Sequence, residues 1–177
     1  MQIVPYFIFV IVLSVSAVTI NGASAHAKTV ESGDSSLSWN GTGEIQELGN
    51  VEQVINGIVK GMVIARHKDG GKLIVHSSKL VCPVRVNLNK KNDSQAIEGL
   101  CTVIAHEGKD VGYAHWKCVG NLKECTGDFT FTGGSGGWTG ISGTTPIQTS
   151  IIFEQQEGKN AQAIGYSVLP NLTYPLP

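Results

Sequence analysis

Two histidines, His67 and His76, are the side chains whose type and spacing best suit ligand binding or catalysis. They flank an Asp-Gly-Gly-Lys segment at 69–72, whose central glycines fit a type I′ hairpin turn. That turn pairs Ala65 with His76 and Ile74 with His67, so the histidines lie diagonally on one face, about 7–8 Å apart at Cα. Such a pair could act as an acid and a base, as a weak metal site, or as polar anchors for a ligand.

Trp116 is expected on the same face, where its indole would offer a stacking surface. The alternative interpretation is that His67 and His76 lie near the mouth of the domain and form hydrogen bonds only with water or the backbone. A metal site needs more ligands, and no third histidine, cysteine or carboxylate falls reliably on this face. The sequence therefore predicts no metal and no other cofactor.

The other candidate groups are expected to play no chemical role. His106 and His115 belong to the opposite face, which we expect to be solvated, and the charged turn at 107–110, including Asp110, is interpreted as solubilising. The glycine-rich segment at 133–140 lacks the Lys-Ser/Thr pair of a phosphate-binding loop. It also lacks the Gly-x-Ser-x-Gly spacing of a nucleophile elbow, so no serine nucleophile is predicted there.

Four cysteines, separated by 18, 16 and 6 residues with no C-x-x-C pair, fit no common zinc module. A polar Lys-Lys-Asn-Asp turn, centred between its second and third residues, sets Cys82 directly opposite Cys101, at a separation that suits a cross-strand disulfide. Cys118 and Cys125 would then form a second disulfide. Pro83 could shift this register, because it has no N–H to donate to a ladder.

The first part of the chain has the features of an export signal. Residues 3–20 are nearly all apolar, and small residues follow that allow cleavage after Ala25 or Ala27, although no Lys or Arg precedes the apolar run. An uncleaved membrane anchor is the alternative, because such a run is just long enough to span a bilayer. We expect a signal peptide at 1–25 and a secreted or periplasmic protein with no stable membrane insertion after cleavage.

The rest of the chain is predicted to be one β domain. Residues 26–42 are Ser-rich and are expected to form a flexible lead-in, residues 43–168 the domain, and residues 169–177 a Pro-rich tail. Apart from a weak helical pattern at 51–59, short β-type runs alternate with glycine-bearing turns. Eight strands with short connections indicate an antiparallel up-and-down sheet, and closure into a barrel would remove its edges. The expected strands are 43–49, 53–67, 72–88, 96–107, 110–118, 124–132, 140–153 and 161–168.

Alternation along these strands predicts an apolar interior. The Glu-Gly-Lys-Asp segment at 107–110 has the pattern of a two-residue type II′ turn, which would pair Cys101 with Trp116 and Val103 with Ala114. Combined with the other turns, this register places mostly apolar side chains on one face. The expected interior residues are Val63, Ala65, His67, Ile74, His76, Leu80, Cys82, Val84, Val86, Ile97, Cys101, Val103, Ala105, Ala114 and Trp116.

The most specific local pattern is the segment at 132–143, where Trp138 stands between two glycine turns. It resembles the Gly-Gly-Thr-Gly-x-Phe segment of dirigent proteins and allene oxide cyclases, and still more that of small exported bacterial proteins with no assigned activity. Ser135 and Gly137 stand where those proteins have Thr and Lys or Asp. The resemblance implies an eight-stranded antiparallel barrel. The motif is expected to be structural, with glycines at positive φ and an aromatic plug at a barrel end. Its residues are Gly133, Gly134, Gly136, Trp138, Gly140 and Gly143.

The resemblance transfers no catalytic residue. In allene oxide cyclases a buried Glu and Asn act on an apolar ligand, and in dirigent proteins Asp, Arg and Tyr help to position theirs. No position of this chain can be matched to them residue by residue. Glu44, on the first expected strand, is the one carboxylate that would be tested for such a role.

Composition narrows the function without naming a reaction. The formal net charge is −1 and 15% of residues are charged, which argues against nucleic-acid binding driven by bulk positive charge. The leading hypothesis is non-catalytic binding of a small apolar or aromatic molecule in the barrel lumen. The alternatives are an isomerase or cyclase like the plant barrels, and a structural or surface-interaction protein with a filled lumen. The sequence does not predict an oligomeric state.

Overall fold

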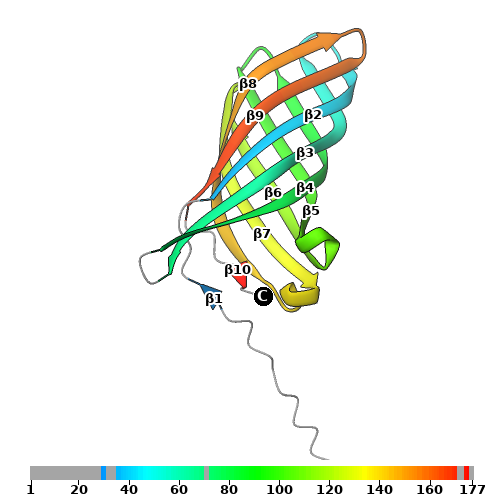
Figure 1. The fold of residues 1–177 in the computed structure, drawn as a ribbon. Helices are drawn as coiled ribbons and strands as arrows, with labels where there is room; N and C mark the ends of the chain where they lie inside the picture. The colour runs from blue at the N-terminus through cyan, green and yellow to red at the C-terminus, as the bar shows by residue number, and fades with distance from the viewer. Residues whose placement is uncertain (1–28, 31–34, 70–71, 171–173, 176–177) are drawn as a thin grey trace, which may run out of the picture.

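The computed structural model describes residues 29–30, 35–69, 72–170 and 174–175. Within these residues eight long strands form a closed antiparallel barrel, in which each strand pairs with the next and the last pairs with the first (Figure 1). The barrel strands are β2 (Ser35–Leu48), β3 (Glu52–Asp69), β4 (Lys72–Asn89), β5 (Ser94–Ala105), β6 (Asp110–Gly120), β7 (Glu124–Ser135), β8 (Gly143–Glu157) and β9 (Asn160–Leu169).

Short elements lie outside the barrel wall. Strand β1 (Thr29–Val30) pairs with β10 (Tyr174–Pro175), and two 3-10 turns, η1 (His106–Gly108) and η2 (Gly136–Trp138), lie at the same end of the barrel (Figure 1). No helix in the described part of the chain has the length and apolar character to cross a membrane. The expected signal peptide at 1–25 lies outside the described residues.

The middle of the lumen is filled by tightly packed side chains. Trp39 and Trp116, which are 5% and 1% exposed, meet edge to face with their ring centroids 6.5 Å apart. The indole N–H of Trp39 donates to the Ser167 hydroxyl at 3.2 Å, and that hydroxyl lies 2.8 Å from the hydroxyl of Thr149. Leu80 and Cys82 are fully buried beside them. The strands are therefore held around a solid centre rather than an open channel.

The barrel begins earlier than the sequence predicts. Strand β2 starts at Ser35, so residues 35–42, expected in the flexible lead-in, belong to the barrel wall. The Ser-Leu-Ser-Trp alternation points Ser35, Leu37 and Trp39 inward, and β2 pairs with both β3 and β9. The weak helical pattern at 51–59 does not correspond to a helix, because residues 52–59 belong to strand β3.

Of the three registers that the turns predict, those of β3–β4 and β4–β5 are confirmed and that of β5–β6 is wrong. The β3–β4 ladder pairs Ala65 with His76, as the type I′ turn predicts. Between β5 and β6, Cys101 faces Ala114 rather than Trp116, which faces Gly99. The connection there spans the four residues 106–109 and contains η1, so it is two residues longer than a type II′ loop. Because the register moves by two residues, the same side chains still face inward.

Both expected disulfides are present. Cys82 and Cys101 join β4 to β5 with their Cα atoms 4.1 Å apart, and Cys118 and Cys125 join β6 to β7 across 5.5 Å. Pro83 does not shift the register, because Val81 faces Thr102 and Val84 faces Gly99 on either side of it. Disulfides of this kind are typical of proteins in an oxidising, extracellular environment.

The β3–β4 hairpin extends past the rest of the wall. The β2–β3 ladder reaches Ala65, and the β4–β5 ladder begins at Lys79, so residues 72–78 of β4 pair with β3 alone. Figure 1 shows this arm projecting from the end of the barrel that carries β1 and β10. Among the described residues of the arm, His76, Ser77 and Ser78 line a hollow at this end, and strand alternation turns the side chains of His76 and Ser78 toward it.

Replacing Cys82 and Cys101 together by Ala is expected to lower the free energy of unfolding by about 3 kcal/mol. Replacing Cys118 and Cys125 is expected to cost about 2 kcal/mol, because the second disulfide closes a loop of 7 residues rather than 19. Urea denaturation of the oxidised variants would measure both losses. Equal losses, or a larger loss for the second pair, would contradict the expected order.

Candidate ligand-binding site

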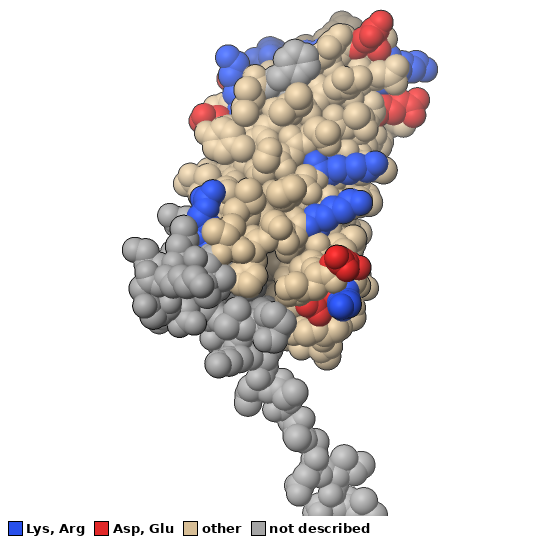
Figure 2. Space-filling model, viewed as in Figure 1, with Lys and Arg blue, Asp and Glu red and all other residues tan. Residues whose placement is uncertain are grey.

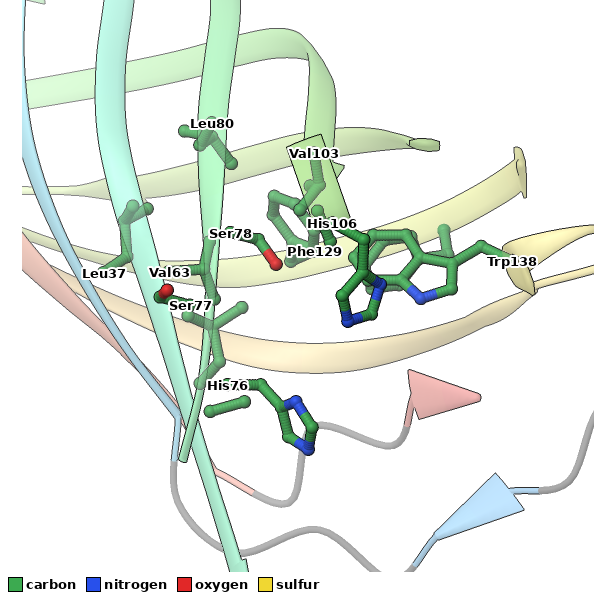
Figure 3. A pocket seen from close by; sticks show the side chains of 14 residues that line it. Leu37, Val63, His76, Ser77, Ser78, Leu80, Val103, His106, Phe129 and Trp138 are labelled. Atoms are coloured by element: carbon green, nitrogen blue, oxygen red, sulfur yellow. The ribbon is translucent and has the colours of Figure 1, made fainter. Parts of the chain in front are cut away.

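A hollow at one end of the lumen is the candidate site, and we call it the His76 pocket. The enclosed cavity is about 40 Å³, and about 660 Å³ is free of protein atoms when the open mouth is counted. Because one water needs roughly 10–15 Å³ of such a cavity, the enclosed part alone holds only a few waters, and a larger guest must also occupy the mouth. Its lining includes Leu37, Val63, His76, Ser77, Ser78, Leu80, Val103, His106, Phe129, Phe131 and Trp138 (Figure 3).

Aromatic side chains form one side of the pocket. Phe129 and Phe131 alternate inward on β7 and meet edge to face at 5.4 Å between centroids, and Phe131 meets Trp138 of η2 at 6.4 Å. Gly112 on β6 makes room for them, because a Cβ there would lie 2.8 Å from an atom of the Trp138 indole. The aromatic side is thus built jointly by the strands and by the turn that follows β7.

The glycine-rich segment forms that turn. Gly136, Gly140 and Gly143 have positive φ, whereas Gly133 and Gly134 do not. Trp138 is 6% exposed and lies at the end of the lumen, as the plug expected from the sequence pattern. The segment also makes a polar contact that the sequence analysis missed, because the backbone N–H of Gly137 donates to a carboxylate on β6.

That carboxylate belongs to Asp110, for which a solubilising role was wrong. Asp110 is 6% exposed, accepts the Gly137 N–H at 2.6 Å, and pairs through its other oxygen with Nδ1 of His106. The Gly137 hydrogen bond, and next the His106 hydrogen bond, lower the pKa of Asp110 below its usual value. Asp110 connects η1 to η2, because it contacts His106 of η1 and Gly137 of η2. Gly137 lies 27 residues after Asp110 in the sequence, so local patterns do not predict this contact.

His106 is also placed differently from the sequence interpretation. It lines the His76 pocket, and its side chain is 42% exposed. His106 and Glu107 both have left-handed backbone, with φ of 46° and 58°, which costs a non-glycine residue on the order of 1 kcal/mol or more. The chain leaves β geometry after Ala105, so strand alternation no longer decides which way His106 points.

The three predicted ligand contacts do not form one site. His76 lines the His76 pocket and is half-buried, whereas Trp116 lines a second hollow at the other end of the lumen. The backbone of His67 pairs with Ile74 as expected, but its side chain lies outside the described part of the structure. Glu44 is exposed on β2, so it is not the buried carboxylate that a catalytic role in the lumen would require.

The second hollow, which we call the Trp116 pocket, exposes less polar surface than the His76 pocket does. The enclosed cavity is about 70 Å³, and about 620 Å³ is free of protein atoms when the open mouth is counted. Apolar side chains dominate its wall, with Gln95 buried among them. Across both hollows and the rest of the described chain, no three His, Cys, Asp or Glu side chains are grouped as metal ligands.

Comparisons of the chain with protein-family models, with curated proteins and with solved structures give no match. The site must therefore be interpreted from its own geometry.

Replacing Asp110 by Asn is expected to reduce the dependence of stability on acidic pH. The folded-state pKa of Asp110 lies below the unfolded value of about 3.9, so its ionised form stabilises the fold above about pH 4. That contribution is lost as the pH falls through the lowered pKa. Thermal denaturation between pH 2 and pH 7 would measure it.

Asp128→Asn is the matched control, because it removes the same charge from an exposed position on β7. The wild-type protein and Asp128→Asn should lose stability more steeply with acid than Asp110→Asn. Parallel profiles for the two variants would contradict the role of Asp110.

Proposed function

We propose that this protein is an exported, disulfide-bonded barrel that binds a small apolar or aromatic molecule in the His76 pocket without transforming it. The observation that carries the proposal is the composition of the pocket wall, where Phe129, Phe131 and Trp138 face Leu37 and Val63 around a partly open hollow. Ligand sites commonly combine such apolar walls with a few polar groups that fix orientation.

The His76 pocket suits a specific ligand better than the Trp116 pocket does. Its rim carries two imidazoles and one hydroxyl, those of His76, His106 and Ser78. These groups come from β4 and η1, on opposite sides of the mouth in Figure 3, so they can contact different parts of one molecule. A cyclase-like reaction has less support, because Glu44 is exposed and the centre of the lumen is filled.

The proposal also includes export of the protein and a relationship to a known type of barrel. A signal peptide cleaved after Ala25 or Ala27 would deliver the chain to the periplasm or the medium, and the two disulfides are consistent with such a compartment. The closed eight-stranded barrel and the plug at Trp138 support kinship with the dirigent and allene oxide cyclase type of barrel.

A surface-interaction role is the second candidate, and the outer face of β8, β9, β2 and β3 favours it. Figure 2 shows few charged side chains over these strands. Met62 and Tyr166 are exposed there on either side of Ser38, which pairs with both, and Ile58, Ile152 and Ile164 are exposed on the same four strands. An interaction protein would need this face and not the pocket.

Native mass spectrometry of protein purified from its own host is expected to reveal a bound molecule of low mass. Val63→Phe should lower the bound fraction at least about tenfold, because the larger ring would fill the His76 pocket. Val86→Phe, which fills the Trp116 pocket, is the matched control and should retain the molecule.

Circular dichroism would show that both variants are folded. A bound molecule lost from the Val86→Phe variant alone would place the ligand in the Trp116 pocket and contradict the assignment. Protein that carries nothing and binds no small apolar probe would favour the surface-interaction role.

A further inference from the structure

The side chain of His106 is held at the mouth of the His76 pocket by a buried carboxylate. Asp110 accepts from Nδ1 of His106, and its other oxygen is fixed by the backbone N–H of Gly137. Among the described residues this is the only hydrogen bond or ion pair of the His106 side chain. The second ring nitrogen, Nε2, is therefore available to a ligand.

The backbone around His106 indicates that this placement has a use. His106 and Glu107 are non-glycine residues at positive φ, followed by Gly108, whose φ is 90°. Left-handed backbone is unfavourable for such residues and is retained mostly where the surroundings require it, often at binding sites.

The carboxylate selects which nitrogen carries the proton. At neutral pH Asp110 is ionised and can only accept, so a neutral imidazole donates from Nδ1 and keeps its lone pair on Nε2. Lys109 and Glu107 belong to the same turn and are exposed, and His76 lies on β4 across the pocket. The arrangement therefore presents one oriented hydrogen-bond acceptor at the rim of an apolar hollow.

The groups around Nε2 of His106 indicate which kind of ligand would fit there. In Figure 3 the imidazole of His106 lies beside the indole of Trp138, with Ser78 and Val63 on the other side of the hollow. We propose that the His76 pocket selects an uncharged molecule that joins a small apolar skeleton to a hydroxyl group, and that the hydroxyl donates to Nε2 of His106. This inference rests on the proposed function, and it makes His106 the residue that determines specificity.

Four probes of one ring size test the inference on the wild-type protein: cyclohexanol, cyclohexanone, methylcyclohexane and cyclohexanecarboxylate. NMR titration at neutral pH would give the affinities, and the ¹⁵N shifts of the His106 ring would report on Nε2 directly. Cyclohexanol should bind about three- to tenfold more tightly than cyclohexanone or methylcyclohexane, the factor expected for one neutral hydrogen bond. Its binding should also move the Nε2 resonance.

His106→Asn is the matched variant, because Asn tolerates left-handed backbone but lacks the second ring nitrogen. The preference for cyclohexanol over cyclohexanone should fall to about one. His115→Asn, on the outer side of β6 where His115 contacts Glu98, is the control and should keep the preference. If His106→Asn does not fold, the wild-type Nε2 resonance still decides.

The outcomes separate this inference from the proposed function. Equal affinity for cyclohexanol, cyclohexanone and methylcyclohexane would overturn the hydroxyl preference and leave apolar binding intact. Tighter binding of cyclohexanecarboxylate would overturn it too, because a carboxylate needs a donor and not an acceptor. Failure of all four probes to bind would overturn both proposals.

Discussion

The ladder between β2 and β9 is the constraint on which the rest of the structure depends. It pairs Ser35–Glu44 of β2 with Asn160–Leu169, at opposite ends of the domain in sequence, and thereby turns a meander with two open edges into a closed wall. The Trp39–Ser167 hydrogen bond reinforces the same junction from inside the lumen. Closure forces alternate side chains of every strand into one small interior, which explains why the centre is packed solid and why hollows persist only at the ends.

The turns at one end of the barrel complete the His76 pocket. Strands form the walls of the His76 pocket and carry His76 on its rim, whereas His106 comes from η1 and Trp138 from η2, the turns that follow β5 and β7. The carboxylate of Asp110 connects the two turns, because one oxygen accepts from each of them. The shape of the plug and the orientation of the imidazole are therefore set by the same contact. A substitution in either turn would therefore alter the geometry of both turns.

Sequence patterns predicted the parts of the fold that local periodicity controls. The β3–β4 register, the inward face and the Cys82–Cys101 pairing all follow from alternation and turn chemistry. The start of β2 was missed, because three serines, Ser35, Ser36 and Ser38, conceal its alternation. His106 and Asp110 were misplaced for another reason. Their positions depend on a four-residue turn in which His106, Glu107 and Gly108 are left-handed, and on a hydrogen bond to Gly137, and neither leaves a periodic trace in the sequence.

The wall of the His76 pocket is less firmly held at the projecting arm of the β3–β4 hairpin than on its other sides. Residues 72–78 of β4 are held by the β3 ladder alone, whereas the strands opposite have neighbours on both sides. Elements held by one ladder exchange their amide hydrogens through local opening at lower free energy than the sheet around them. His76, Ser77 and Ser78 lie on this weaker element. Local opening of this one hairpin would therefore reshape one wall of the His76 pocket while the rest of the barrel stays folded.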